Sequence, residues 1–145
     1  MSLRELYQEM ILDHGKYPRN FGSLTHANHI HAGHNPVCGD KLMVYVLAQD
    51  RKIIDIQFEG VGCAISMASA SLMTEILKGK SLEDTNHLFH CFHELVTTGH
   101  DNEDLGKLAV FSGVAEFPVR VKCATLAWHT LKAALENKST AVSTE

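Results

Sequence analysis

Residues 53–71 read IIDIQFEGVGCAISMASAS, and this stretch decides the fold class. Apolar and polar side chains largely alternate over its first six residues, which is typical of a β-strand with one buried face. Gly60 and Gly62 then interrupt the strand, and the sequence predicts a helix that opens at Cys63 and runs to about Lys78. Alanine and serine dominate the start of this helix, so its backbone is expected to lie very close to whatever it packs on.

Two further strands are predicted before this stretch. Residues 42–47 form a mostly apolar run, and the tight connection at Asp50-Arg51 leads from them to the strand at 53–58. These two strands are therefore expected to pair as an antiparallel hairpin. A third strand is expected around residues 26–32.

Helices are predicted at both ends of the chain. Ser2 and Glu5 have the spacing of a capping box, and the helix that they begin is expected to stop at Gly15. Three more helices are predicted to begin at Ser81, near Leu105 and at Pro118.

This order of elements is a helix, three strands and then a run of helices. It predicts an α+β fold in which a three-stranded antiparallel sheet is packed by helices on one face. Residues 1–138 are expected to form a single domain, and the Ser/Thr-rich residues 139–145 a disordered tail.

Composition excludes several classes of function. The chain has 145 residues, a net charge of -4 and scattered basic residues, which argues against a nucleic-acid-binding protein. It contains no apolar run of the roughly 20 residues that a membrane helix needs. The N-terminus has no secretory signal pattern, so a cytoplasmic protein is expected. In that reducing compartment the four cysteines are better explained as metal ligands or reactive thiols than as disulfides.

Three of the cysteines occupy positions that favour chemistry. Cys38 lies in a Pro/Gly/Asp turn, Cys63 at the junction of strand and helix, and Cys123 in the opening turns of the last helix. A helix N-terminus favours the thiolate, which is the form that binds metal and attacks sulfur. With Asp40, which follows Cys38 by two residues, the three cysteines would complete a tetrahedral shell suited to zinc.

Other interpretations of these residues remain open. A buried cysteine is often only a small apolar residue, and we assign Cys91 to that class, while Cys63 and Cys123 are compatible with either role on periodicity alone. His87, His90 and His93 share a helix face and are interpreted as a solvated stripe in preference to a metal site. His26, His29, His31 and His34 are crowded before Cys38, and His34 comes closest to it. One of them could be a fourth ligand or a proton shuttle, but a place on a polar strand edge is the favoured interpretation.

Three segments resemble the signature segments of the IscU/NifU N-terminal family. They read NPVCGD at 35–40, FEGVGCAISMASAS at 58–71 and RVKCATLAW at 120–128. The opening segment, from Leu6 to Asn20, is similar as well. Together the four segments extend the resemblance over essentially the whole chain up to about Lys138.

Within that family the chain resembles the SufU branch. IscU-type scaffolds have a histidine directly before the third cysteine, where this chain has Lys122. They also lack most of the helical segment that this chain places between about Ser81 and Gly113. Phe117-Pro118-Val119-Arg120 stands where IscU proteins have a Leu-Pro-Pro-Val-Lys segment that binds a specialised chaperone.

The resemblance implies a metal site and a partner. It implies that Cys38, Asp40, Cys63 and Cys123 bind Zn²⁺ tightly, and that a pyridoxal-phosphate-dependent cysteine desulfurase of the SufS kind donates persulfide sulfur to Cys38. In SufU-type proteins the cysteine that matches Cys38 leaves the zinc when a desulfurase histidine replaces it. The residue that matches Arg120 is implicated in that exchange.

The leading hypothesis is therefore a zinc-dependent sulfurtransferase that passes sulfur from the desulfurase to downstream cluster-assembly proteins. The alternative is a scaffold on which a transient [2Fe-2S] cluster is assembled on the same ligands, and a zinc-stabilised adaptor without turnover is a third. Lys122 favours the first hypothesis over the second, because lysine is a poor cluster ligand.

Overall fold

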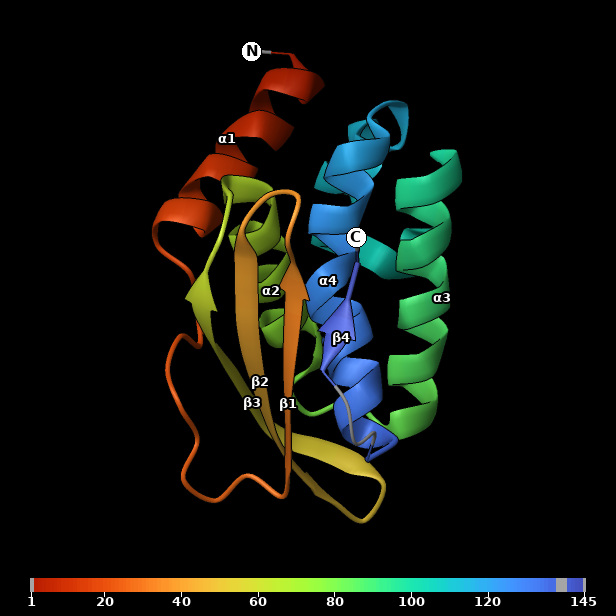
Figure 1. Cartoon of the computed structure of the whole chain (residues 1–145). Coiled ribbons are helices and arrows are strands. Elements are labelled where there is room, and N and C mark those ends of the chain that lie inside the picture. The colour runs from red at the N-terminus through yellow and green to blue at the C-terminus, as the bar shows by residue number, and fades with distance from the viewer. Residues whose placement is uncertain (1, 138–140, 145) are drawn as a thin grey trace.

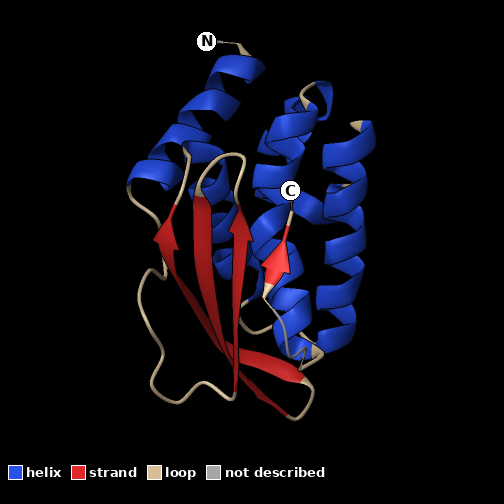
Figure 2. Cartoon of the chain, viewed as in Figure 1, coloured by secondary structure: helices blue, strands red, loops and turns tan. Residues whose placement is uncertain are grey.

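The computed structural model describes residues 2–137 and 141–144. Along the chain these form helix α1 (Leu3–Lys16), strands β1 (His29–Asn35), β2 (Asp40–Gln49) and β3 (Lys52–Val61), helices α2 (Ala64–Leu77) and α3 (Leu82–Thr98), the 3-10 segment η1 (Glu103–Glu116), helix α4 (Pro118–Leu135) and the short strand β4 (Val142–Ser143). The helices pack on one face of the sheet, which confirms the predicted α+β class (Figure 1; Figure 2). In the described part of the chain, no helix is long and apolar enough to cross a membrane.

The sheet has four strands where three were predicted. β1, β2 and β3 pair antiparallel as expected, and β4 adds in parallel to the outer edge of β1, which gives the order β3-β2-β1-β4. β4 pairs with Gly33 and His34, and the N–H of Thr144 donates to the carbonyl of His34 over 3.1 Å. The unpaired backbone groups of an edge strand attract such an addition. Residues 142–143 of the predicted tail thus form β4, while residues 138–140 and 145 lie outside the described residues.

Helix α2 is buried around its whole circumference, from residue 66 to residue 74. Trp128 of α4 stacks on Phe92 of α3 with ring centroids 4.6 Å apart, and its indole N–H donates to Ser69 of α2 over 3.2 Å. Ser69 donates in turn to the carbonyl oxygen of Ala124 over 2.5 Å. The small side chains of α2 therefore allow close packing and also satisfy buried polar groups on α4.

Gly15 was predicted to end α1, but α1 continues to Lys16. A Cβ atom at Gly15 would lie 2.9 Å from the backbone oxygen of Ala64, the first residue of α2. The glycine is needed for the close contact between two helices. Only the tertiary structure shows that requirement.

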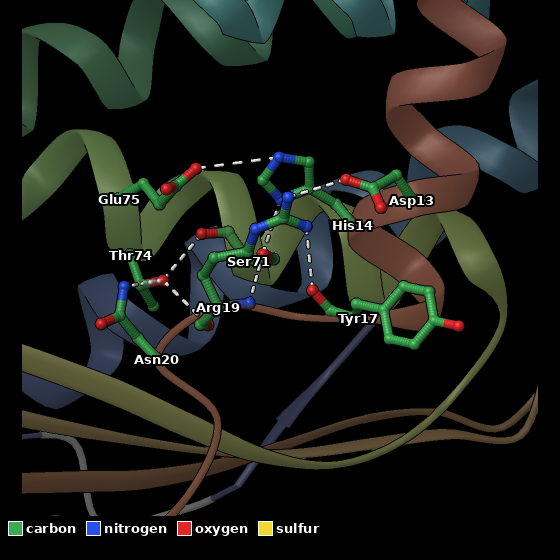
Figure 3. Close-up of polar contacts among 8 residues, drawn as sticks. All are labelled: Asp13, His14, Tyr17, Arg19, Asn20, Ser71, Thr74 and Glu75. Carbon is green, nitrogen blue, oxygen red and sulfur yellow. Dashed lines mark hydrogen bonds and ion pairs between the residues drawn. The ribbon is translucent and has the colours of Figure 1, made fainter.

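A buried hydrogen-bond network fastens the end of α1 to α2 (Figure 3). The Ser71 hydroxyl accepts the backbone N–H of Arg19 over 2.9 Å and lies 2.7 Å from Nδ1 of His14, whose Nε2 is 3.7 Å from the Glu75 carboxylate. Burial lowers the pKa of His14, and the Arg19 guanidinium lowers it further. Ser71 is 0% exposed, so its hydroxyl cannot meet a substrate, and the network acts as a structural clamp.

Candidate functional site

The three predicted cysteines and Asp40 come together at one end of the molecule. The turn between β1 and β2, the end of β3 and the first turns of α2 and α4 all lie there (Figure 1). Cys38 belongs to that turn, and Asp40 begins β2. Cys63 is the N-cap of α2, and Cys123 lies in the second turn of α4, which Pro118 opens from its first position.

Three of the four predicted ligands form one compact cluster. The Sγ atoms of Cys38 and Cys123 and a carboxylate oxygen of Asp40 all lie within 4.8 Å of one another. The Cys123 thiol donates to the sulfur of Cys38 over 3.1 Å. Cys63 is not a member of this mutually close set, although its thiol interacts with that of Cys123. The structure therefore places the fourth predicted ligand beside the cluster.

Asp40 is a buried carboxylate held by two protein donors. It is 0% exposed, its Oδ1 accepts the backbone N–H of Cys63 over 2.8 Å, and its Oδ2 accepts the side-chain amide of Asn35 over 3.4 Å. Gly62 makes this arrangement possible, because a Cβ atom there would lie 2.7 Å from Oδ1. Asp40 thus joins the start of β2 to the start of α2 at the cluster itself.

Cys63 is held by the helix that it begins. Its Sγ accepts the backbone N–H of Ser66 over 3.4 Å, as the side chain of an N-cap residue does. The start of α2 therefore fixes the position of the Cys63 sulfur beside the cluster.

Cys123 is the most deeply buried of the three site cysteines, at 2% exposed. Burial raises the pKa of its thiol far above the usual range, and the hydrogen bond to Cys38 and the nearby Cys63 raise it further. Several potential anions share a site from which water is largely excluded, and a divalent cation is the group that would make their joint ionisation favourable.

The donor set fits zinc. Two thiolates at about 2.3 Å from a tetrahedral zinc lie about 3.8 Å apart. The sulfurs of Cys38 and Cys123 are 3.1 Å apart, so a separation of less than 1 Å more would admit the ion. Cys38 can provide it, since it sits in a turn where Gly39 has a φ of 73° and no neighbour within 4 Å of an added Cβ.

Arg120 lies close to Cys123 in the first turns of α4. It is exposed and stands three residues before Cys123 on α4, so the two project from a similar side of the helix. Its guanidinium lies 4.4 Å from the centre of the Phe117 ring. Other exposed apolar residues flank the ligands in the chain, namely Val37, Val61 and Val119. The exposed residues near the ligands in the chain therefore include cations, among them Lys41 and Lys122, as well as apolar side chains.

The remaining cysteine and the histidine stripe have other contacts. Cys91 is buried in the core cluster, as predicted, and its sulfur lies 3.6 Å from Nε2 of His87. His87 also pairs with Asp104 over 3.0 Å. His93 stacks on Phe89, with ring centroids 6.4 Å apart. Packing and ion pairing account for these groups.

Asn35 was missed as a site residue, and its contacts bring it into the site. Its side-chain amide donates to Asp40 and also to the sulfur of Cys123 over 3.5 Å. The sequence contained one indication of a special role for Asn35, the Asn-Pro pair shortly before Cys38. That signal was explained by turn formation alone.

Comparison with known proteins identifies the relatives of this chain. The family model described as "NifU-like N terminal domain" matches residues 6–141. An iron–sulfur cluster assembly scaffold protein IscU of Streptococcus pyogenes serotype M1 is 41% identical over 96% of this chain and 88% of its own length. The zinc-dependent sulfurtransferase SufU of Bacillus subtilis is 40% identical over 90% of both chains.

A solved structure shows the same fold. The crystal structure of an iron–sulfur cluster assembly scaffold protein for the SUF system, from Fervidobacterium islandicum AW-1, superposes with a TM-score of 0.84 at 35% identity. The match covers 92% of this chain and 99% of the other. Relatives named as scaffold and as sulfurtransferase are almost equally similar, so overall identity does not separate the two activities.

Proposed function

Because the chain belongs to the NifU-like N-terminal domain family, whose members here are iron–sulfur cluster assembly proteins, we propose that it is a zinc-dependent sulfurtransferase. In this proposal Cys38 accepts persulfide sulfur from a pyridoxal-phosphate-dependent cysteine desulfurase of the SufS kind. The sulfur then passes to downstream cluster-assembly proteins. The unequal anchoring of the four ligand residues is the observation that carries the proposal.

Three of the four residues are held by groups outside the ligand set, whereas the hydrogen bond to Cys38 comes from Cys123, another member of that set. Asp40 and Cys123 are buried and hydrogen-bonded to Asn35, and Cys63 caps α2. Cys38 is partly exposed and belongs to a turn. A residue in that position can leave a shared metal and return to it, whereas the other three hold their places.

Zinc, when bound, would keep the Cys38 sulfur deprotonated and protected from oxidation. After release, the Cys38 thiolate attacks the outer sulfur of the desulfurase persulfide. A bond forms between Cys38 Sγ and that sulfur while the partner's S–S bond breaks. The electron pair of the broken bond stays on the partner's cysteine as a thiolate, so the exchange needs no oxidant or reductant.

Exposed residues near the ligands in the chain would serve this exchange. Arg120, three residues before Cys123 on α4, offers a positive charge that would attract the anionic persulfide and the thiolate that forms on the partner's cysteine. The apolar residues Val37, Val61 and Val119 offer surface that a partner can cover, so that water is excluded during transfer.

A scaffold that assembles a [2Fe-2S] cluster on the same residues is the competing function. Lys122, which precedes Cys123, argues against it, because an ammonium group cannot ligate a cluster. Lys122 is also exposed and lines a shallow groove that α4 shares with β4.

The test combines metal analysis with sulfur transfer. Freshly purified protein is expected to hold one zinc per chain, to raise the turnover of a SufS-type desulfurase and to carry labelled persulfide. Cys38→Ser is expected to lose the persulfide and the stimulation, whereas the matched control Cys91→Ala keeps both. Persulfide retained by Cys38→Ser would refute the acceptor role. A coloured protein that loads a [2Fe-2S] cluster and leaves turnover unchanged would establish the scaffold instead.

A further inference from the structure

Asn35 ends β1 and is buried, at 0% exposed, in contact with two residues of the candidate metal site. It faces Asp40 across the antiparallel ladder, as its register partner. A fully buried side-chain amide needs hydrogen-bond partners for its polar atoms. Two of the partners of Asn35, Asp40 and Cys123, are residues of the site.

The contacts fix the orientation of the amide. Its carbonyl oxygen accepts the backbone N–H of Val37 over 3.3 Å, which leaves the NH₂ group to face the site. One N–H reaches Oδ2 of Asp40 at 3.4 Å, and the same nitrogen lies 3.5 Å from Sγ of Cys123. The reverse orientation would put a carbonyl oxygen against a carboxylate, so electrostatics selects the observed one.

Both of these donations go to anchored residues, and neither involves Cys38. We propose that Asn35 is a positioning residue that holds Asp40 and Cys123 on the metal while Cys38 leaves it. The inference rests on the proposed function, because it presupposes that the four ligand residues bind a metal.

The chemistry of asparagine suits this task. It provides two N–H donors and one acceptor at a fixed length and carries no charge. An aspartate would place a further negative charge against Asp40 and Cys123, and a leucine of similar size would offer no donor. Hydrogen bonds to metal ligands typically change metal affinity by about 10- to 100-fold.

The experiment uses Co²⁺ as a spectroscopic probe of the metal-binding protein, with Asn35→Leu as the test variant. Asn28→Leu is the matched control, because the Asn28 amide bonds to the backbone of Ala48, near the far end of β2. Asn35→Leu is expected to raise the Co²⁺ dissociation constant by about 10- to 100-fold. The thiolate-to-cobalt charge-transfer band of the fully loaded variant is expected at longer wavelength, since the Cys123 sulfur has lost a hydrogen bond. A purely structural role would not move that band.

A second comparison tests the retention of ligands. In a Cys38→Ala background the loss of affinity on adding Asn35→Leu is expected to exceed the loss in the wild-type background, because the metal then depends on three ligand residues, two of which Asn35 holds. If Asn35→Leu fails to fold, Asn35→Ser replaces it, since serine keeps one donor at most.

The outcomes separate this inference from the proposed function. An Asn35 variant that is folded and has wild-type affinity and spectrum would overturn the positioning role and leave sulfur transfer untouched. Normal Co²⁺ spectra in a protein that accepts no persulfide would overturn sulfur transfer and leave Asn35 in its role. A wild-type chain that binds no Co²⁺ would overturn both.

Discussion

Gly62→Ala tests whether Asp40 is held as tightly as the structure indicates. An added Cβ would stand 2.7 Å from Asp40 Oδ1, against the 3.4 Å at which ordinary contact begins, so one of the two groups has to move by about 0.7 Å. The same oxygen accepts the Cys63 N–H over 2.8 Å, so a movement of Oδ1 strains that hydrogen bond.

The cost follows from the two effects that this displacement combines. Overpacking at a rigid position costs about 1–3 kcal/mol, and a hydrogen bond to a charged group contributes about 1.5–3 kcal/mol. These costs overlap, so a loss of about 2 kcal/mol in the free energy of unfolding is expected. The same displacement shifts Asp40 relative to the other ligand residues, and each 1.4 kcal/mol lost there weakens zinc binding about tenfold.

Two measurements check this prediction. Urea unfolding of the metal-free protein gives the stability, and competition with a chromophoric chelator gives the zinc dissociation constant, which is expected to rise by about one to two powers of ten. Gly113→Ala is the matched control, because an added Cβ at Gly113 has no neighbour within 4 Å. If Gly62→Ala behaved like Gly113→Ala in both assays, Asp40 would not be held in the way described.

Two serines of α2 and one histidine of α1 give the remaining predictions. Ser66→Ala is expected to raise the free energy of unfolding, because the buried Ser66 hydroxyl has no hydrogen-bond partner among the described residues. Ser69→Ala is expected to lower the free energy of unfolding by about 1–3 kcal/mol, because the buried Trp128 N–H then has no acceptor. Urea denaturation compares the two variants, and equal effects would contradict the hydrogen-bond assignment. Burial lowers the pKa of His14, so the unfolded chain, with an ordinary histidine pKa of about 6.5, takes up its proton first, and stability is expected to fall as the pH drops below that value. His14→Gln is expected to flatten this dependence in unfolding measurements between about pH 7.5 and 5, while His26→Gln, at an exposed residue, should leave the slope unchanged.

The sequence predicted the parts of the fold that local patterns determine. Alternation and a tight connection revealed β2 and β3, and the caps at Ser2 and Ser81 marked the starts of α1 and α3, where the structure confirms them. Gly15 was misassigned because a glycine that ends a helix and a glycine that admits a neighbouring helix look alike in one dimension. β4 was missed because a strand of two residues has no measurable period.

The candidate site was predicted less completely, for a related reason. The cysteines and Asp40 stood out by residue type and by their places at turns and helix starts, and the structure brings three of the four within 4.8 Å. Asn35 and Gly62 have no distinctive chemistry of their own, and their importance arises only from contact with Asp40. Such supporting residues become visible when distances are known.

The way in which Asp40 is held bears on how the site can open. Where a small domain depends on zinc to fold, release of a ligand loosens the whole structure. Here the core is built from large buried side chains such as Trp128, Phe58 and Phe111, none of which belongs to the site. Asp40 and Cys63 are tied to each other by a protein hydrogen bond that does not require Cys38. Detachment of Cys38 would therefore change one turn and leave the fold intact, which is the property that a repeated transfer of sulfur requires.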